Sequence, residues 1–322
     1  MTDAPIALTC GDPAGIGPEL AAKAWTDLGA SLPFFLLGDP SHLPEGTSVA
    51  VIEAPEETAA AAARGLPVLR HPFPAPARPG HPDPANAPAT VSVIERAVAL
   101  VQTGRASAVT TAPISKQVLI DGAGFAYPGH TEFLAALGGV ERVVMMLVSP
   151  QLRVVPTTIH IPLSQVAVQL TPDLLRDTIR ITVEGLRRHF GLDSPRVAVA
   201  GLNPHAGEGG KLGHEEGTWI AGLIAGLAAE GLAITGPHPA DTMFHAAARA
   251  RYDVAVAMYH DQALIPVKTL DFDRGVNVTL GLPFVRTSPD HGTAFDIAGR
   301  GIANPTSLIE ALKLARAMSA RG

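Results

Sequence analysis

The chain has 322 residues, of which 47% are hydrophobic and 17% charged, and its formal net charge is −6. This composition excludes a largely disordered chain, and the lack of any Lys/Arg cluster excludes nucleic-acid binding driven by charge alone. The best candidate for a transmembrane helix, 220–235, is too short, the first residues lack the pattern of a signal peptide, and Cys10 is the only cysteine. We therefore expect a cytoplasmic protein without disulfides or a cysteine-rich zinc module.

Short apolar segments alternate with helical patterns through the first half of the chain. A buried strand is expected at 5–10, followed by a glycine-containing segment and a helix to about residue 28, in which Pro18 and Glu19 are typical of a first turn. Seven prolines within 71–90 predict a long surface loop, because proline fits neither a helix interior nor a central strand. Further strands are expected at 34–37, 49–52, 67–69 and 108–111, and a further helix at 90–103.

The second half repeats this alternation. Thr171 is the expected N-cap of a long helix, 172–190. Further helices are expected at 132–137, 214–230 and 305–318, and strands at 142–148, 153–158, 196–200, 253–257 and 277–280.

Strands that alternate with helices predict βαβ units and a mostly parallel sheet. At roughly 150 residues per domain, the length corresponds to about two domains. We predict an α/β fold of two α/β/α lobes with a central cleft. The first lobe comprises residues 1–128 and 295–322, so that the last helix packs back onto it, and the second lobe comprises residues 129–294.

Three histidines follow predicted strands: His160, His205 and His260. Ligands of open α/β sheets bind outside the carboxyl ends of the strands, so three imidazoles there could hold one divalent metal and leave positions open for substrate. Asp261 could orient its neighbour His260 or touch the metal or substrate, and Asp241 is a second carboxylate nearby in sequence. The same residues also fit unrelated polar loops, since their spacing matches no local metal motif.

A second group of residues is suited to anions. Lys268 and Arg286, with Asn277 between them, could bind phosphate or carboxylate, Arg286 through its planar fork. His130 and Thr131 stand where a loop enters a helix and could add donors to a phosphate. Surface charge and simple helix capping would explain the same residues.

Two loops could hold a cofactor. Residues 11–17 follow a strand and open a helix, but their G-x-x-x-G-x-G spacing matches neither the dinucleotide nor the Walker A pattern. The polar segment 287–293, which contains Asp290, His291 and Gly292, is expected to be a loop before a helix. It could hold cofactor or substrate, or only cap that helix.

Six motifs together resemble the 4-hydroxythreonine-4-phosphate dehydrogenase (PdxA) family. They extend from residue 9 to about residue 300, and their combination is specific although each alone is modest. The motifs are Gly11-Asp-Pro-Ala-Gly-Ile-Gly-Pro-Glu19, Gly129-His-Thr-Glu132, Gly201-Leu-Asn-Pro-His-Ala-Gly-Glu208, Pro239-Ala-Asp-Thr242, Tyr259-His-Asp-Gln262 and the segment 275–293.

The resemblance implies a fold shared with isocitrate and isopropylmalate dehydrogenases, which bind a nicotinamide cofactor without the G-x-G-x-x-G pattern. It implies a homodimer with its active site at the subunit interface, using NAD or NADP and one divalent metal per subunit (Zn2+, Mg2+ or Co2+). The implied metal ligands are His160, His205 and His260. The implied substrate contacts are His130, Thr131, Lys268, Asn277 and Arg286.

The reaction implied by the resemblance belongs to pyridoxal 5'-phosphate (vitamin B6) biosynthesis. NAD+ oxidises the C3 hydroxyl of 4-phosphohydroxy-L-threonine, and the β-keto acid loses CO2 to give 3-amino-1-hydroxyacetone 1-phosphate. The proton acceptor could be Asp241, Asp261, Lys268 or a water, and the cofactor contacts are expected at Asp290, His291 and Gly292.

Three other functions fit parts of the pattern. A paralogous dehydrogenase of threonate or erythronate 4-phosphate would share most of the motifs. A metal-dependent hydrolase commonly carries a His-x-His pair on a strand, which this sequence lacks. A non-catalytic phosphosugar-binding protein would keep the cationic residues but need no metal.

Overall fold

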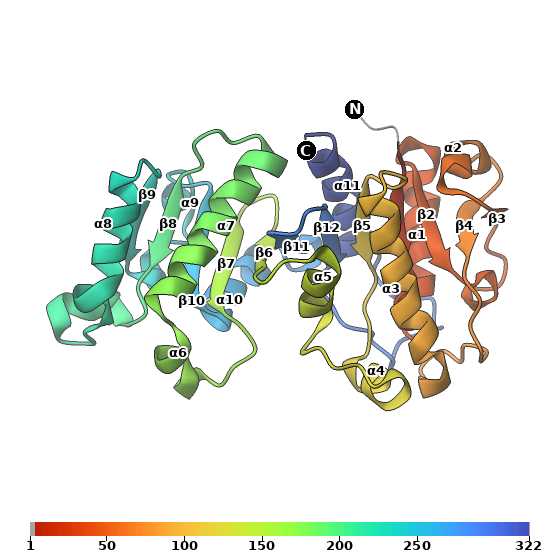
Figure 1. Ribbon diagram of the computed structural model, residues 1–322, viewed down its shortest axis with the longest axis horizontal. Helices are drawn as coiled ribbons and strands as arrows, with labels where there is room; N and C mark the ends of the chain where they lie inside the picture. Colours follow the sequence, from red (N-terminus) through yellow and green to blue (C-terminus); the bar gives the residue numbers. More distant parts are fainter. Residues whose placement is uncertain (1–3, 322) are drawn as a thin grey trace. The chain divides into compact units, whose positions relative to one another are not determined.

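The computed structural model describes residues 4–321, which divide into two compact units (Figure 1). Unit 1 consists of Met1–Arg142 and Leu282–Gly322, and unit 2 of Val143–Gly281. The first unit is thus built from two separate stretches of chain, and its limits lie at residues 142 and 282 where the sequence suggested 128 and 295. The difference matters for the site, because residues 129–142 and 282–294 belong to unit 1.

The sheet of unit 1 has six strands, all parallel, in the order β3-β4-β2-β1-β5-β12. Its central strands are buried apolar runs, as a parallel sheet covered on both faces requires. The strands are β1 (Ile6–Thr9), β2 (Phe34–Gly38), β3 (Val49–Ile52), β4 (Leu66–Arg70), β5 (Ala108–Thr111) and β12 (Arg286–Pro289).

Helix α3 lies on one face of this sheet, and α1 and α11 lie on the other (Figure 1). The last helix therefore belongs to unit 1, where α11 packs on β12 and β5. The helices of unit 1 are α1 (Gly17–Leu28), α2 (Thr58–Ala61), α3 (Ala87–Gln102), α4 (Lys116–Ala123), α5 (His130–Gly138) and α11 (Thr306–Ser319).

The sheet of unit 2 runs β11-β6-β7-β10-β8-β9. Strands β7, β10, β8 and β9 are parallel neighbours, whereas β6 is antiparallel to both β7 and β11. The carboxyl ends of β7, β10 and β8 therefore meet at one edge of the sheet. The strands are β6 (Val144–Val148), β7 (Arg153–Thr158), β8 (Val197–Ala200), β9 (Ile234–His238), β10 (Val254–Tyr259) and β11 (Val276–Leu280).

Helices α7 and α10 cover opposite faces of the sheet of unit 2 (Figure 1). Thr171 caps α7 as expected, because its Oγ1 accepts a hydrogen bond from the Leu174 N–H at 3.2 Å. The helices of unit 2 are α6 (Leu163–Gln169), α7 (Pro172–Phe190), the π-helical turn η6 (Glu216–Ile220), α8 (Ala221–Ala229), α9 (Ala246–Arg249) and α10 (His260–Leu270).

Three sequence expectations need correction. The segment expected to be a loop at 287–293 begins as strand β12, because Arg286 and Thr287 pair with β5. Helix α10 was missed because Pro266 lies inside it. The loop expected at 71–90 is shorter, because the 3-10 turn η4 (Pro84–Asn86) leads directly into α3, which begins at Ala87.

Among residues 4–321, no helix is long and apolar enough to cross a membrane.

Candidate active site

Two of the predicted metal ligands come together in unit 2. His160 follows β7 and His260 follows β10, and these strands are parallel neighbours with Thr158 opposite Tyr259. The two imidazole ring centres lie 5.8 Å apart. Two imidazoles on one tetrahedral ion, each with a nitrogen about 2.0–2.1 Å from the metal, have ring centres roughly 5–6 Å apart. The pair therefore fits a shared divalent ion.

Asp261 orients the second of these histidines. Its Oδ1 lies 2.7 Å from His260 Nδ1. A carboxylate accepts and does not donate, so Nδ1 carries the proton and Nε2 keeps its lone pair for a metal. The contact fits the orienting role that the sequence allowed for Asp261, and this role stays a prediction.

His205 lies at the same edge of the sheet but apart from this pair. It follows β8, the neighbour of β10, in the turn η5 (Pro204–Gly210), and its side chain is 64% exposed. Within the part of the chain that the structure describes, no three His, Cys, Asp or Glu side chains surround a common metal position. The ligand set of three histidines therefore stays a prediction.

The backbone at two of the three histidines is left-handed. The φ angles of His160 and His205 are +54° and +51°. A left-handed residue other than glycine costs about 1–2 kcal/mol, and such strain concentrates at functional sites. Both histidines are thus held in conformations that the sequence alone does not favour.

Two cavities of unit 2 open beside these histidines. One of about 340 Å³ is lined by His160, His260 and Asp261, and one of about 440 Å³ is lined by His260, Asp261 and Lys268. Lys268 lies on α10, where its Nζ is 5.8 Å from the centre of the Phe272 ring. The structure therefore brings Lys268 to the same cavity as His260.

The remaining candidates of unit 2 lie elsewhere. Asn277 is on β11, and its Oδ1 is buried without a hydrogen-bond partner among the described residues. Asp241 is exposed in the turn η7 (Ala240–Thr242) and lines neither of the two cavities. Of the three side chains considered as proton acceptor, Asp261 and Lys268 thus line the same cavity, whereas Asp241 lines neither of the two.

Arg286 is the buried cation of unit 1. It begins β12 and is only 3% exposed, and its Nη2 donates to Thr111 Oγ1 at 2.7 Å. Burial lowers the pKa of Arg286 to about 10. A guanidinium taken out of water gains from an anion that reaches it, which fits the predicted phosphate or carboxylate contact.

His130 lies in the field of this cation. It is the first residue of α5, and its Nε2 is buried without a hydrogen-bond partner among residues 4–321. Burial, and after it the positive charge of Arg286, holds the pKa of His130 well below its usual range. The ring is therefore neutral near pH 7, and an orphaned ring nitrogen next to a guanidinium is suited to a ligand that carries negative charge. Thr131 follows it, half-buried, in the first turn of α5.

The segment predicted to contact the cofactor runs from β12 to α11 in unit 1. Asp290 N donates to Ser307 Oγ at 3.1 Å. His291 Nδ1 lies 3.0 Å from the Gly292 carbonyl oxygen, and its Nε2 is buried without a partner among the described residues. That orphaned nitrogen fits a bound polar group, and it is the feature of this segment that favours a cofactor site over a plain helix cap.

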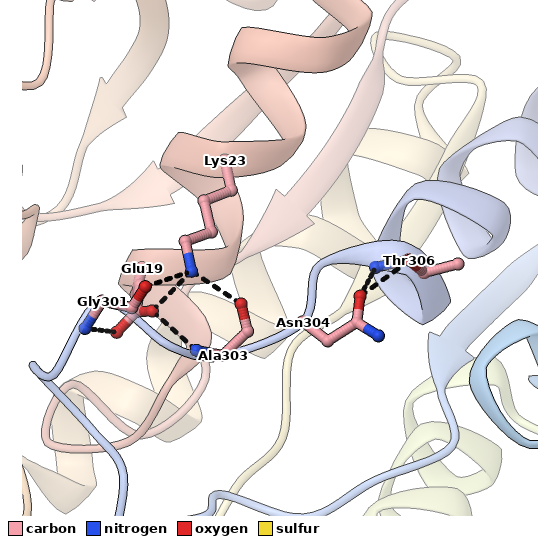
Figure 2. Close-up of polar contacts among 6 residues, drawn as sticks. All are labelled: Glu19, Lys23, Gly301, Ala303, Asn304 and Thr306. Atoms are coloured by element: carbon pink, nitrogen blue, oxygen red, sulfur yellow. Dashed lines mark hydrogen bonds and ion pairs between the residues drawn. The ribbon is translucent and has the colours of Figure 1, made fainter.

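A partly buried ion pair on α1 holds the end of this segment (Figure 2). Glu19, 6% exposed, accepts hydrogen bonds from the Gly301 and Ala303 N–H groups at 3.3 and 3.0 Å. Lys23 Nζ lies 2.9 Å from Glu19 Oε1 and donates to the carbonyls of Gly301 and Ala303. Directly before α11, Asn304 Oδ1 accepts a hydrogen bond from the Thr306 N–H at 3.0 Å. Sequence reasoning placed Glu19 only as a helix-start signal.

The glycine loop at 11–17 meets the same segment. Ile16 N donates to the Thr293 carbonyl oxygen at 3.0 Å. A Cβ on Gly15 would lie 3.0 Å from that oxygen and 3.2 Å from the Thr293 Cβ. Close packing against residue 293 thus accounts for Gly15, and this explains a spacing that matches no phosphate-binding pattern.

The comparisons with known proteins agree with this architecture. The family model of the pyridoxal phosphate biosynthetic protein PdxA matches residues 32–315. A 4-hydroxythreonine-4-phosphate dehydrogenase of Ruegeria sp. (strain TM1040) is 64% identical over 321 residues, which cover 99% of this chain and 98% of the relative. One of Paracoccus denitrificans (strain Pd 1222) is 63% identical over 326 residues, covering 100% of each. The crystal structure of the enzyme from Klebsiella pneumoniae is 38% identical, covers 98% of this chain and 100% of its own, and superposes with a TM-score of 0.88.

The fold and these relatives define the chain as an α/β oxidoreductase, and the predicted α/β class is confirmed. More narrowly, the chain belongs to the PdxA family of pyridoxal phosphate biosynthesis. The family predicted from the six motifs is thereby confirmed.

Proposed function

We propose that this oxidoreductase, a 4-hydroxythreonine-4-phosphate dehydrogenase by family, oxidises the C3 hydroxyl of 4-phosphohydroxy-L-threonine with NAD+. The β-keto acid then loses CO2 to give 3-amino-1-hydroxyacetone 1-phosphate. The carrying observation is the pair His160 and His260 on adjacent strand ends, with Asp261 on the Nδ1 of His260.

The residues of unit 2 would hold one divalent metal through His160, His205 and His260. Such an ion supplies Lewis acidity, which lowers the pKa of the hydroxyl and stabilises the negative charge that develops as CO2 leaves. Asp261 keeps the proton of His260 on Nδ1, so the ring presents Nε2 in the correct tautomer.

The residues of unit 1 would bind the charged ends of the substrate. Arg286 offers parallel N–H donors to phosphate or carboxylate, and its burial makes each of these hydrogen bonds stronger than at the surface. The neutral His130 and the hydroxyl of Thr131 add uncharged donors. Asn277 and Lys268 of unit 2 complete the proposed set of substrate contacts.

In this proposal, Lys268 is the group that accepts the proton of the C3 hydroxyl. It lines the same cavity as His260, whereas Asp261 already holds the His260 ring and Asp241 does not line that cavity.

We propose that the chain works as a homodimer. Leu163 and Val168 on α6, Ile265 on α10 and Phe272 just beyond it are all exposed apolar side chains. Leu163 lines the cavity of His160 and His260, and Ile265 and Phe272 line the cavity of Lys268. Apolar surface that borders a polar site is typical of an interface, and a second copy of this chain would cover it. Phe272→Ser should shift the chain towards monomers in analytical ultracentrifugation.

The testing experiment is NAD+ reduction followed at 340 nm. We expect NADH with 4-phosphohydroxy-L-threonine, loss of activity after metal removal by a chelator, and recovery with Zn2+, Mg2+ or Co2+. Parallel assays with NADP+, threonate 4-phosphate and erythronate 4-phosphate test the cofactor and the substrate. A hydrolase or a phosphosugar-binding protein would form no NADH under any of these conditions, and that result would overturn the proposal.

A further inference from the structure

The loop that carries His205 has an unusual backbone. Residues 205–209 all have positive φ, at +51°, +51°, +79°, +43° and +64°, and three of them are not glycine. Such a run is disfavoured for L-residues, so neighbouring side chains must hold it. In the free chain these residues would favour right-handed or extended conformations, and the His205 ring would then leave the sheet edge.

A buried carboxylate lies inside this loop. Glu216 is 5% exposed, and its Oε1 accepts from the Asn203 N–H at 2.7 Å while its Oε2 accepts from Asn203 Nδ2 at 3.0 Å. Ala206 N in turn donates to the Asn203 carbonyl oxygen at 3.1 Å. The carboxylate therefore fixes Asn203, which lies two residues before the left-handed run begins.

The loop closes tightly around the same carboxylate. A Cβ on Gly207 would lie 2.8 Å from Glu216 Oε2, and one on Gly201 would lie 3.2 Å from Glu216 Oε1. The Gly201 carbonyl accepts from Gln262 Nε2 at 2.8 Å, and Gln262 Oε1 accepts from the Met258 N–H at 2.7 Å. Gln262 thus ties the start of the loop to β10, directly before His260.

Glu216 is also placed by a feature that is rare in proteins. It begins the π-helical turn Glu216–Ile220 ahead of α8, and single π-turns are frequent at functional sites. Its neighbour Glu215 is half-buried and also accepts a hydrogen bond from Asn203 Nδ2 at 2.8 Å. The carboxylates of two successive residues thus accept from the side-chain amide of Asn203, and of the two only Glu216 is buried.

We propose that Glu216, acting through Asn203, is the positioning residue that sets His205 for metal binding. The inference rests on the proposed metal site. Glu216 itself does not touch the metal in this proposal, so its removal should weaken the contribution of His205 and leave His160 and His260 unaffected.

The test measures Co2+ binding to metal-free protein by calorimetry and by the visible spectrum of the bound ion. Glu216→Gln keeps the shape but loses one acceptor, so we expect its Kd to rise at least about tenfold and its spectrum to match that of His205→Ala. Glu19→Gln is the matched control, because Glu19 is about as buried as Glu216 and its carboxylate also accepts two N–H groups. Both of these are backbone N–H groups of unit 1, whereas Glu216 accepts one backbone and one side-chain N–H of Asn203. The Kd of Glu19→Gln for Co2+ should stay within about twofold of wild type.

The double variant His205→Ala/Glu216→Gln decides how Glu216 acts. If Glu216 works through His205, Glu216→Gln should change the Kd less than about twofold once His205 is absent. A loss that adds fully to that of His205→Ala would overturn the positioning role. Asn203→Ala and Gly207→Ala disrupt the contacts with Glu216 by changing the loop instead of the carboxylate. Both should weaken Co2+ binding as Glu216→Gln does, so they test the proposal even if Glu216→Gln fails to fold.

Failure of the inference and failure of the proposed function give different results. If His205→Ala weakens Co2+ binding but Glu216→Gln, Asn203→Ala and Gly207→Ala do not, only the role of Glu216 is overturned. If His205→Ala binds Co2+ as tightly as wild type, the ligand assignment itself is wrong.

Discussion

The two units hold their candidate site residues in opposite ways. In unit 1, Arg286 and Thr111 are on paired strands, nearly fully buried and hydrogen-bonded to each other. In unit 2, His160 and His205 are on exposed turns with left-handed backbones, and the Asp261 side chain is 70% exposed. In unit 1 the strand pairing of the sheet fixes the position of Arg286 and Thr111. In unit 2 the candidate side chains lie beyond the ends of the strands.

This difference indicates which part of the site needs a ligand to form. A strand register fixes the position of Arg286 before anything binds, because the β5–β12 pairing places it beside Thr111. The exposed imidazole rings keep rotamer freedom even where the backbone is held, and a metal that binds the folded state alone would draw the rings together. We therefore expect a preformed anion subsite in unit 1 and a metal-organised subsite in unit 2.

The largest effect is expected from Arg286→Ala. Removing one partner of a buried charge contact costs about 2–5 kcal/mol, so the KM for the phosphorylated substrate should rise roughly 10²-fold or more. Arg286→Lys keeps the charge and loses the planar fork, and it should recover only part of this loss. Kinetics with and without added phosphate as a competitor measure both variants.

Substrate binding to metal-free protein tests the preformed subsite directly. If Arg286 is set by the sheet alone, calorimetry should detect inorganic phosphate binding without any divalent metal, and Arg286→Ala should abolish it. Phosphate binding that appears only after metal is added would break the contrast between the two units.

His260→Ala should have the next largest effect. Loss of one of three imidazole ligands should weaken Co2+ or Zn2+ binding about 10²-fold, in line with the strength of each metal–nitrogen bond. Competition with a fluorescent chelator measures this loss. Phosphate binding to the metal-free variant should be unchanged, because Arg286 and His130 belong to the other unit. A parallel loss of phosphate affinity would contradict the separation of the two subsites.

Asp261→Asn should give a smaller loss. Groups that orient a metal-bound imidazole typically contribute 10–100-fold to metal affinity, and an amide can still accept from His260 Nδ1 through its oxygen. We expect a Kd for Zn2+ raised about tenfold, measured in the same competition assay. An unchanged Kd would show that Asp261 is held near His260 without orienting it.

Much of the fold could be predicted from the sequence because its signals are local. The predicted strands at 49–52, 108–111 and 153–158 and the helix at 172–190 have the bounds of β3, β5, β7 and α7. Apolar runs between turn residues and a Thr N-cap suffice for these elements. Helix α10 was missed because Pro266 argues against a helix, and only tertiary packing of Ala263, Leu264 and Val267 reveals it.

The candidate site was predictable where residue type carries the chemistry. Histidines that follow strands, and a Lys and an Arg in a lightly charged chain, are visible in the sequence itself, and the six motifs indicated the family. The residues that support the site could not be predicted from the sequence, because Glu216 and Glu19 resemble ordinary helix carboxylates until the loops around them are known. The left-handed run at 205–209 also leaves no trace in composition, since three of its residues are not glycine. Likewise, the unit limits depend on the long-range pairing of β12 with β5.

The smallest predicted effect concerns histidines with a buried ring nitrogen, which occur in both units. His189 on α7 is 8% exposed, and its Nδ1 has no hydrogen-bond partner among the described residues. Burial, and after it the charge of Arg188, lowers the pKa of His189 from 6.5 to about 4. Between these values the unfolded chain binds a proton that the folded chain does not, so the free energy of unfolding falls as the pH falls from about 6.5 towards 4.

His189→Leu should remove this part of the acid sensitivity. At pH 5.5 the histidine should lower the free energy of unfolding by about 1 kcal/mol relative to pH 7.5, and urea denaturation at the two pH values measures the difference. The variant should lose that drop in the free energy of unfolding but keep the drop due to His130, whose pKa is also held low.

Added phosphate separates the contributions of the two histidines. An anion beside His130 would raise the pKa of that ring and reduce its contribution to the acid sensitivity, but would leave the contribution of His189 unchanged. Equal pH sensitivity in wild type and His189→Leu would show that the ring is hydrated or shielded in the folded state. Acid sensitivity unaffected by phosphate would contradict the assignment of His130 to the anion subsite of unit 1.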